Sequence, residues 1–248
     1  MSDNSDAALV IGAAGGIGAA VTGALAARYA RVYGVSRQPS PPAALASLTP
    51  LRWLRADDDE AAIAAAAEAL AAALAADAAR LARVVICIGT LHGDDFRPEK
   101  SLRELRADTL MHVYRVNAVL PALWLAALEP LLRRADSCCV AVLSARVGSI
   151  GDNGLGGWYA YRASKAGLNM LLRSAAVEIA RRSPRVALLA FHPGTTATAL
   201  SAPFQGRVPA EKLFAAPRVA EALLERMAET PADGQLHFRD YAGDTVPW

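Results

Sequence analysis

The chain has 248 residues, of which 54% are hydrophobic and 20% are charged, and its formal net charge is +2. This length suits one α/β domain with a substantial core, and the composition is that of a globular protein, not a disordered one. The nearly balanced charge provides no basic field for a polyanion, so we expect no nucleic-acid partner.

The N-terminus and the cysteines indicate a cytoplasmic protein without a membrane partner. The first residues, MSDNSDAALVIG, lack the basic and long apolar regions of a signal peptide, and no uninterrupted apolar run is long enough to span a membrane. Cys87, Cys138 and Cys139 lie in apolar runs without metal-like spacing. We therefore expect buried, reduced thiols, no disulfide framework and no metal site.

Short apolar runs alternate with longer helical patterns along the chain. The predicted strands are 8–11, 32–35, 51–54, 84–88, 139–143 and 186–191. Helix-length segments lie at about 16–29, 59–82, 101–133 (long enough for two helices) and 160–182, followed by a helix near 217–229 and a strand at 235–239. Strands separated by helices predict an α/β fold: a single doubly wound Rossmann-type domain over residues 1–248, with about seven parallel strands and helices on both faces.

The first strand runs into the segment GAAGGIG, residues 12–18. Glycines between a strand and a helix let the backbone approach a pyrophosphate, and the helix N-terminus offers free N–H groups and a positive dipole end. A flexible turn without a ligand is the alternative interpretation. The dinucleotide interpretation predicts contacts from Gly12, Ala14, Gly15, Gly16, Ile17 and Gly18.

The end of the second strand distinguishes between two dinucleotides. A site for NAD needs a carboxylate here to bind the ribose 2′-hydroxyl, but this sequence has Ser36 followed by Arg37. The planar guanidinium of an arginine fits a 2′-phosphate, which favours NADP(H) as the cofactor. The alternative is that Arg37 is a surface residue on a loop.

Tyr161 and Lys165 are four residues apart in the segment YRASK, so they share one face of the predicted helix. A lysine ammonium beside a phenol favours the phenolate and lowers the tyrosine pKa toward the range of a general acid/base. Tyr159 has no such partner, because residue 163 is alanine. The alternative interpretation is a surface Tyr–Lys pair with this spacing by chance.

The glycine loop, Arg37, Asn117, Ser144, YRASK and HPG (192–194) occur in the order and approximate spacing of the short-chain dehydrogenase/reductase family. The chain resembles this family over about residues 8–248. Residues 148–170, GSIGDNGLGGWYAYRASKAGLNM, and the closing GDTVPW look like the C-factor and sniffer-like carbonyl reductase branch.

The resemblance implies that Tyr161 protonates the carbonyl oxygen as hydride arrives from the nicotinamide. Lys165 would lower the pKa of Tyr161 and hold the nicotinamide ribose. Asn117 would bend its helix and hold a water of the proton relay, although a locally satisfied polar residue is the alternative. The other cofactor contacts that the resemblance implies are Cys87, Ile88, Gly89, Pro193, Gly194, Thr195, Thr196 and Thr198.

Asp57 lies near the position of an adenine-contacting aspartate in the family. The acidic run 57–60 leaves the register open, and it equally suits a solvated helix N-terminus with favourable dipole charge.

Three positions depart from the family pattern. The second serine that usually follows the fifth strand is Ala145, and Ser144 should point to the opposite face of that strand. The serine role therefore falls to Ser144, to Ser149 or to no serine. The usual asparagines after the fourth strand are missing from ICIG, and the usual threonine before Gly12 is Ile11.

The expected function is that of an NADP(H)-dependent oxidoreductase, which transfers hydride between NADPH and a small carbonyl or alcohol compound with Tyr161 as general acid/base. A catalytically weak or inactive NADP(H)-binding sensor is the alternative that Ala145 motivates.

The resemblance also places a substrate lid around 199–216, and the cleft would border Trp158 and Tyr159. The lid residues Leu200, Phe204, Leu213 and Phe214 suggest an apolar or aromatic carbonyl compound. On the helix from residue 160, an apolar outer face made of Leu168, Leu171, Leu172 and Val177 suggests a homodimer or tetramer, although related reductases can be monomers.

Overall fold

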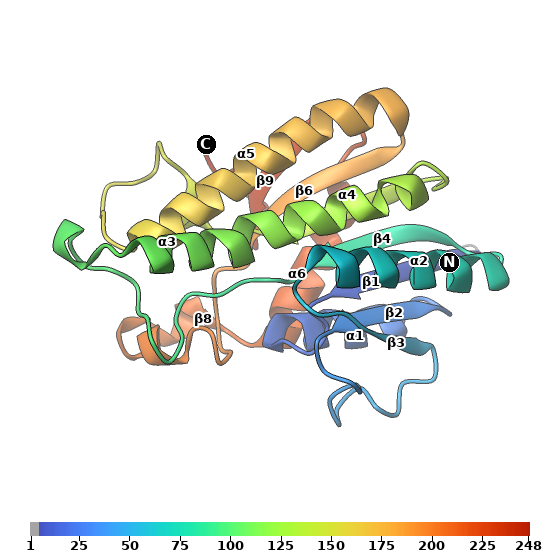
Figure 1. Ribbon diagram of the computed structural model, residues 1–248, viewed down its shortest axis with the longest axis horizontal. Helices are drawn as coiled ribbons and strands as arrows, with labels where there is room; N and C mark the ends of the chain where they lie inside the picture. Colours follow the sequence, from blue (N-terminus) through green and yellow to red (C-terminus); the bar gives the residue numbers. More distant parts are fainter. Residues whose placement is uncertain (1–4) are drawn as a thin grey trace.

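The computed structural model describes residues 5–248, apart from the side chain of Arg207. Its centre is a seven-stranded sheet in the order β3-β2-β1-β4-β5-β6-β9, in which all neighbouring strands are parallel (Figure 1). The predicted doubly wound sheet is confirmed. The strands are β1 (Asp6–Ile11), β2 (Val32–Ser36), β3 (Leu51–Arg55), β4 (Arg80–Ile86), β5 (Cys138–Leu143), β6 (Val186–His192) and β9 (Leu236–Asp240).

Helices cover both faces of the sheet. One face buries apolar side chains of α1 and α6, and the other buries those of α2, α4 and α5. The buried strands carry nearly continuous apolar runs, as expected of parallel strands covered on two sides. The helices are α1 (Gly16–Ala26), α2 (Glu60–Ala76), α3 (Ala107–Tyr114), α4 (Leu120–Leu132), α5 (Tyr159–Arg182) and α6 (Ala216–Glu229).

Several predicted boundaries were wrong. The helix predicted over 59–82 ends at Ala76, because Ala78 has a positive φ of 48° and β4 already begins at Arg80. The strand predicted over 84–88 ends at Ile86, which leaves residues 87–89 as a loop at the edge of the sheet.

The segment predicted over 101–133 begins as a 3-10 turn, Leu102–Glu104, and becomes α-helical only at Ala107. A π-helical turn, Arg115–Val119, then joins α3 to α4 without a break. The stretch Ala107–Leu132 is long and apolar enough by length and composition to cross a membrane, but 44% of its most apolar window is buried. Trp124 and Leu128 of this stretch lie in the core against the sheet, as in a core helix.

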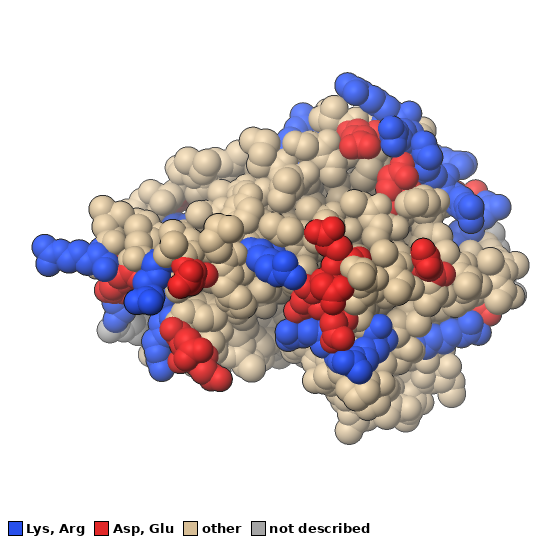
Figure 2. All heavy atoms as spheres, viewed as in Figure 1, with Lys and Arg blue, Asp and Glu red and all other residues tan. Residues whose placement is uncertain are grey.

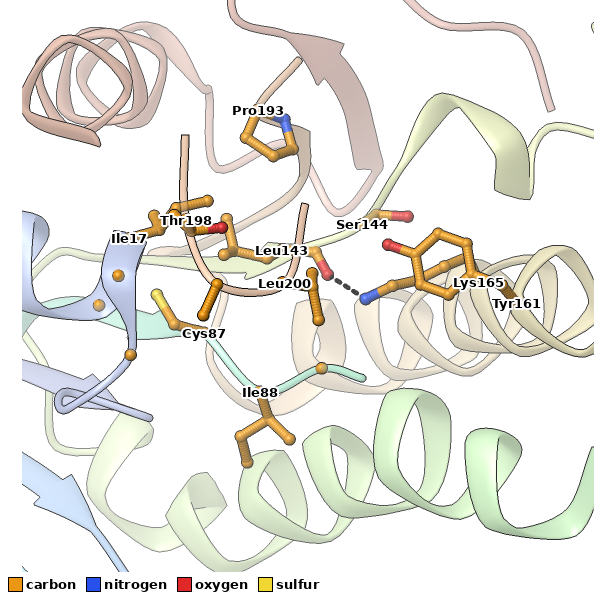
Figure 3. Close-up of a pocket in the computed structure, with 15 residues that line it drawn as sticks. Ile17, Cys87, Ile88, Leu143, Ser144, Tyr161, Lys165, Pro193, Thr198 and Leu200 are labelled. Atoms are coloured by element: carbon orange, nitrogen blue, oxygen red, sulfur yellow. Dashed lines mark hydrogen bonds between the residues drawn. The ribbon is translucent and has the colours of Figure 1, made fainter. Parts of the chain in front are cut away.

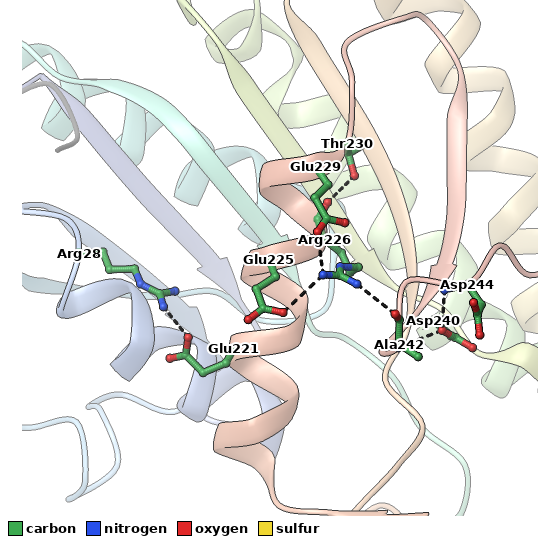
Figure 4. Close-up of polar contacts among 9 residues, drawn as sticks. All are labelled: Arg28, Glu221, Glu225, Arg226, Glu229, Thr230, Asp240, Ala242 and Asp244. Carbon is green, nitrogen blue, oxygen red and sulfur yellow. Dashed lines mark hydrogen bonds and ion pairs between the residues drawn. The ribbon is translucent and has the colours of Figure 1, made fainter.

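Polar contacts fasten α6 to its neighbours (Figure 4). Arg28, just after α1, forms an ion pair with Glu221 of α6. Arg226 donates to the carbonyl oxygen of Ala242, 3.1 Å away in the turn after β9. These contacts anchor the helix that directly follows the predicted lid.

The outer face of α5 differs from the prediction. Leu168 and Leu172 belong to the core, because the helix turns them toward the sheet, whereas Leu171 and Val177 are exposed. On the side shown in Figure 2, acidic and basic side chains are mixed, and the surface over the middle of α5 is largely uncharged.

Candidate active site

A cavity of about 230 Å³ opens at the carboxyl ends of the central strands (Figure 3). The loops after β1 and β4, the end of β5, the first turns of α5 and the segment after β6 enclose it. It brings together predicted residues from all of these elements, including Ala199 of the predicted lid, and adds Leu143, which was not predicted. The lining residues are Gly15, Gly16, Ile17, Gly18, Cys87, Ile88, Gly89, Leu143, Ser144, Tyr161, Lys165, Pro193, Thr198, Ala199 and Leu200.

The glycine loop needs glycine at two positions for steric reasons. Gly12 has φ +81°, and a Cβ there would lie 2.9 Å from the carbonyl oxygen of Cys87. A Cβ on Gly16 would lie 2.5 Å from the Thr198 Cγ2 atom. Among the described residues no side chain caps the start of α1, so the N–H groups of its first turn are available to an anion. Gly12 and Ala14 support the loop without lining the cavity.

The residues after β2 and β3 lie outside the cavity, on the surface. Arg37 is 71% exposed at its side chain, and its Nη1 lies 3.0 Å from Asp58 Oδ2. The Ser36 Oγ atom accepts a hydrogen bond from the backbone of Gln38. Asp57 is paired with Arg55, while Asp59 caps α2 by accepting from the N–H of Ala62. The acidic run therefore includes a helix cap, as the alternative interpretation expected.

Asn117 lies fully buried in the π-helical turn between α3 and α4. Its Oδ1 accepts from the Thr90 N–H at 2.7 Å, and its Nδ2 donates to the Thr90 carbonyl at 2.9 Å and to Ser164 Oγ at 3.0 Å. The π-helical turn interrupts the regular α-helical hydrogen bonding at Asn117. The partners are not local in sequence: Asn117 joins the loop after β4 to α5.

Lys165 and Tyr161 both line the cavity, one turn apart on α5 (Figure 3). The Lys165 Nζ atom donates to the Leu143 carbonyl oxygen at 2.8 Å and lies 6.0 Å from the centroid of the Tyr161 ring. Burial lowers the pKa of Lys165 to about 8, because a low-dielectric environment disfavours the ammonium.

The expected lowering of the Tyr161 pKa is wrong for this structure. Burial raises the pKa of Tyr161 to about 12, and the ammonium of Lys165 does not offset that effect. The shared helix face sets only the spacing of the two side chains. The direction of the lysine is set by the Leu143 carbonyl oxygen.

Among the candidate serines, Ser144 lines the cavity and Ser149 does not. The Ser144 Oγ donates to Asn169 Oδ1 on α5 at 2.7 Å. The Ser149 Oγ instead accepts from the N–H of Asp152, within its own loop. The buried Ala145 contributes no hydroxyl group.

The turn after β6 contributes Pro193 and Thr198 to the cavity. Gly194 has φ +68°, and a Cβ there would lie 2.7 Å from the ring of Phe214. Thr195 and Thr196 form the short strand β7 (Thr195–Thr196), which pairs with β8 (Leu213–Phe214). The predicted lid thus begins and ends on one small sheet.

The lid contributes Leu200 to the cavity. Phe214 was expected to face the substrate as well, and that prediction was wrong. Phe214 is buried against Tyr241, with the ring centroids 4.4 Å apart. Phe204 instead contacts Trp158, with 5.3 Å between centroids, and the Trp158 ring lies edge-on to Tyr161 at 6.2 Å. Trp158 therefore contacts a lining residue, Tyr161, but neither Trp158 nor Tyr159 lines the cavity itself.

Comparisons with known proteins agree with this geometry. A family model described as short chain dehydrogenase matches residues 6–207. C-signal from Myxococcus xanthus is 31% identical over 139 residues, which is 56% of this chain and 78% of that protein.

Two solved structures share the fold. The NADPH-bound carbonyl reductase from chicken fatty liver has a TM-score of 0.83 at 23% identity, over 98% of this chain and 94% of that one. A short-chain dehydrogenase/reductase from Burkholderia multivorans with bound NADP has a TM-score of 0.79 at 26% identity, over 98% and 99%.

Proposed function

The chain belongs to the short chain dehydrogenase family and is an oxidoreductase, and from that premise we propose that it reduces carbonyl compounds with NADPH, using Tyr161 as the general acid. The observation that carries this proposal is the cavity at the carboxyl ends of the strands. It holds the glycine loop, Tyr161 and Lys165 in one space, where parallel α/β sheets bind ligands.

The residues present fit a dinucleotide phosphate. The glycine cradle leaves no room for a Cβ at Gly12 or Gly16, and the uncapped start of α1 offers N–H donors to the pyrophosphate. Ser36 and Arg37 would bind the 2′-phosphate, and Asp57 would lie toward the adenine. When bound, NADPH supplies the hydride. The residues proposed for its nicotinamide end are Lys165, Pro193, Gly194, Thr195, Thr196 and Thr198.

Tyr161 would supply the proton. A pKa of about 12 keeps its phenol protonated at neutral pH, so the side chain is ready to donate to a carbonyl oxygen. Lys165 would hold the nicotinamide ribose and carry the positive charge that stabilises the phenolate after transfer. Asn117 holds the loop after β4 against α5. Ser144, which lines the cavity, would provide the serine hydroxyl.

The walls of the cleft support an apolar or aromatic carbonyl compound as the substrate. Leu200 lines the cavity, and the ring of Trp158 lies beside Tyr161 and contacts Phe204 of the lid. Such surfaces bind planar apolar groups by burial and by ring contacts. We infer that residues 199–216 form the lid of a single domain spanning residues 1–248.

The exposed face of α3 and α5 supports a homodimer or tetramer. Met111 is 72% exposed and Met170 is 66% exposed, and Leu171 and Val177 of α5 are exposed apolar side chains as well. Sedimentation analysis of the purified protein tests this assembly. We also infer a cytoplasmic location, because the three cysteines are free. The balanced charge supports a protein with neither nucleic-acid nor membrane partners.

Titration of the purified protein with NADPH and with NADH, followed by fluorescence, tests the proposed function. We expect tight binding of NADPH and weak binding of NADH, with oxidation of bound NADPH when an aromatic ketone is added. Binding of NADPH without any oxidation would favour the sensor, and binding of neither dinucleotide would overturn the proposal.

A further inference from the structure

The helix that carries Tyr161 starts without a capping side chain of its own. Its N-cap residue is Trp158, which has a positive φ of 52° and makes no side-chain capping bond. A bulky residue in this left-handed conformation is strained, and it persists only where its surroundings hold it. The start of α5 therefore needs support from elsewhere in the chain.

Glu99, in the loop before α3, provides that support. Its backbone carbonyl oxygen accepts from the Trp158 N–H at 2.5 Å, and its Oε2 atom accepts from the Ala160 N–H at 3.1 Å. The two bonds from one residue lie on either side of Tyr159, and 61 residues of chain separate Glu99 from Ala160. Ala160 is the second residue of α5, so Glu99 replaces the missing cap.

Glu99 is buried without a full set of hydrogen-bond partners in the described part of the chain. Only 2% of the residue is exposed, its Oε1 atom has no hydrogen-bond partner in the described part of the chain, and no ion pair with it occurs there. A buried carboxylate without a counter-charge is unfavourable unless hydrogen bonds compensate. The N–H groups and dipole of the α5 N-terminus are the partners that stabilise it here.

The turn of α5 that Glu99 contacts carries Tyr161, the proposed general acid. Tyr161 is the third residue of α5, and its ring lies edge-on to Trp158, which in turn contacts Phe204 of the lid. A shift in the first turn of the helix would move the Tyr161 phenol and the Trp158 ring together.

We propose that Glu99 is a positioning residue for the reductase: its carboxylate fixes the first turn of α5, and thereby places the Tyr161 phenol in the cleft and the Trp158 ring beside it. This inference rests on the proposed function. The feature that acts is the hydrogen-bond acceptor at Oε2. An amide oxygen at the same place would serve equally well, whereas a shorter or missing side chain would not reach.

Glu99→Gln and Glu99→Ala separate this role from simple packing. We expect Glu99→Ala to lower kcat at least tenfold, because a misplacement of about 1 Å can cost about a hundredfold in rate. The dissociation constant for NADPH should stay within about twofold of the wild type, because the glycine loop is untouched. Glu99→Gln should keep kcat within about threefold of the wild type.

Asp77→Ala is the matched control. Asp77 is also a largely buried carboxylate that accepts hydrogen bonds, from Tyr33 and Arg52, but it lies at the end of α2 away from the cleft. It should lower Tm without lowering kcat. If Glu99→Ala fails to fold, Glu99→Asp keeps the charge but shortens the side chain, and we expect it to lose kcat where Glu99→Gln does not.

Hydrogen exchange gives a readout that does not depend on turnover. Amides of residues 159–165 should exchange faster in Glu99→Ala than in the wild type or Glu99→Gln. Inactivity of the wild type on every carbonyl compound would overturn the proposed function and leave this exchange result intact. Glu99→Ala with wild-type kcat and exchange, or Glu99→Gln as impaired as Glu99→Ala, would overturn the role of Glu99.

Discussion

The ammonium of Lys165 donates to the carbonyl oxygen of Leu143 at 2.8 Å, while the centroid of the Tyr161 ring lies 6.0 Å from it. The last residue of β5 thus holds the lysine in the cleft, at the edge where the ribose of a dinucleotide is expected. Burial is the main cause of both pKa shifts: it lowers the pKa of Lys165 to about 8 and raises that of Tyr161 to about 12.

The pKa of Lys165 predicts a pH dependence of stability. Its ordinary pKa is 10.5, so between about pH 8 and 10.5 the unfolded chain binds more protons than the native protein. The free energy of unfolding should therefore rise with pH across this window, and the burial penalty is full below it. The raised pKa of Tyr161 affects the free energy of unfolding only above about pH 10, where the phenol of the unfolded chain begins to ionise.

Urea unfolding of the wild type and of Lys165→Met checks this prediction. Between pH 7 and about pH 9.5, the wild type should gain about 2 kcal/mol more unfolding free energy than the variant. Parallel pH curves for the two proteins would show that the lysine has an ordinary pKa.

Arg37 and Asp58 should have opposite effects on the binding of NADPH. Arg37→Ala removes a charged donor to the 2′-phosphate, so we expect the dissociation constant for NADPH to rise by about 10- to 100-fold. Asp58→Asn should tighten NADPH binding, because it releases Arg37 from its ion pair. Neither change should affect NADH, which lacks the phosphate. Equal losses for both dinucleotides in Arg37→Ala would mean that the arginine supports the loop only.

Two substitutions distinguish which serine, if any, acts in the reaction, because Ser144 and Ser149 are almost equally buried. Ser144→Ala should lower kcat/KM about tenfold, because it removes one hydrogen-bonding hydroxyl from the cleft. Ser149→Ala should leave kcat/KM unchanged, since the Ser149 hydroxyl bonds within its own loop. Steady-state kinetics with an aromatic ketone measures both, and the reverse ranking would assign the role to Ser149. No loss in either variant would mean that no serine acts.

The fold could be predicted because its signals are local. Apolar runs bounded by turns and separated by helical patterns identify parallel strands, and every strand of the main sheet was found to within a few residues. The glycine loop, Tyr161 and Lys165 were found in the same way, because a short motif fixes their spacing. The comparisons then confirmed the family.

The remaining features depend on contacts that no local pattern records. Phe214 was placed in the cleft from its position in the lid, but β8 turns its ring against Tyr241. Lys165 was expected to act on Tyr161 directly, because a helical spacing says nothing about a carbonyl oxygen on a neighbouring strand. The contact of Glu99 with α5 could not be predicted from a local pattern, since its partner Ala160 lies 61 residues away.

The central claim is that Tyr161 donates the proton in an NADPH-dependent reduction. Its most direct test is the single-turnover rate of NADPH oxidation by an aromatic ketone in the wild type and in Tyr161→Phe. We expect Tyr161→Phe to bind NADPH as the wild type does, but to react at least about a hundredfold more slowly, the usual contribution of a general acid. An equal rate in Tyr161→Phe, with alcohol formed in both, would contradict the assignment.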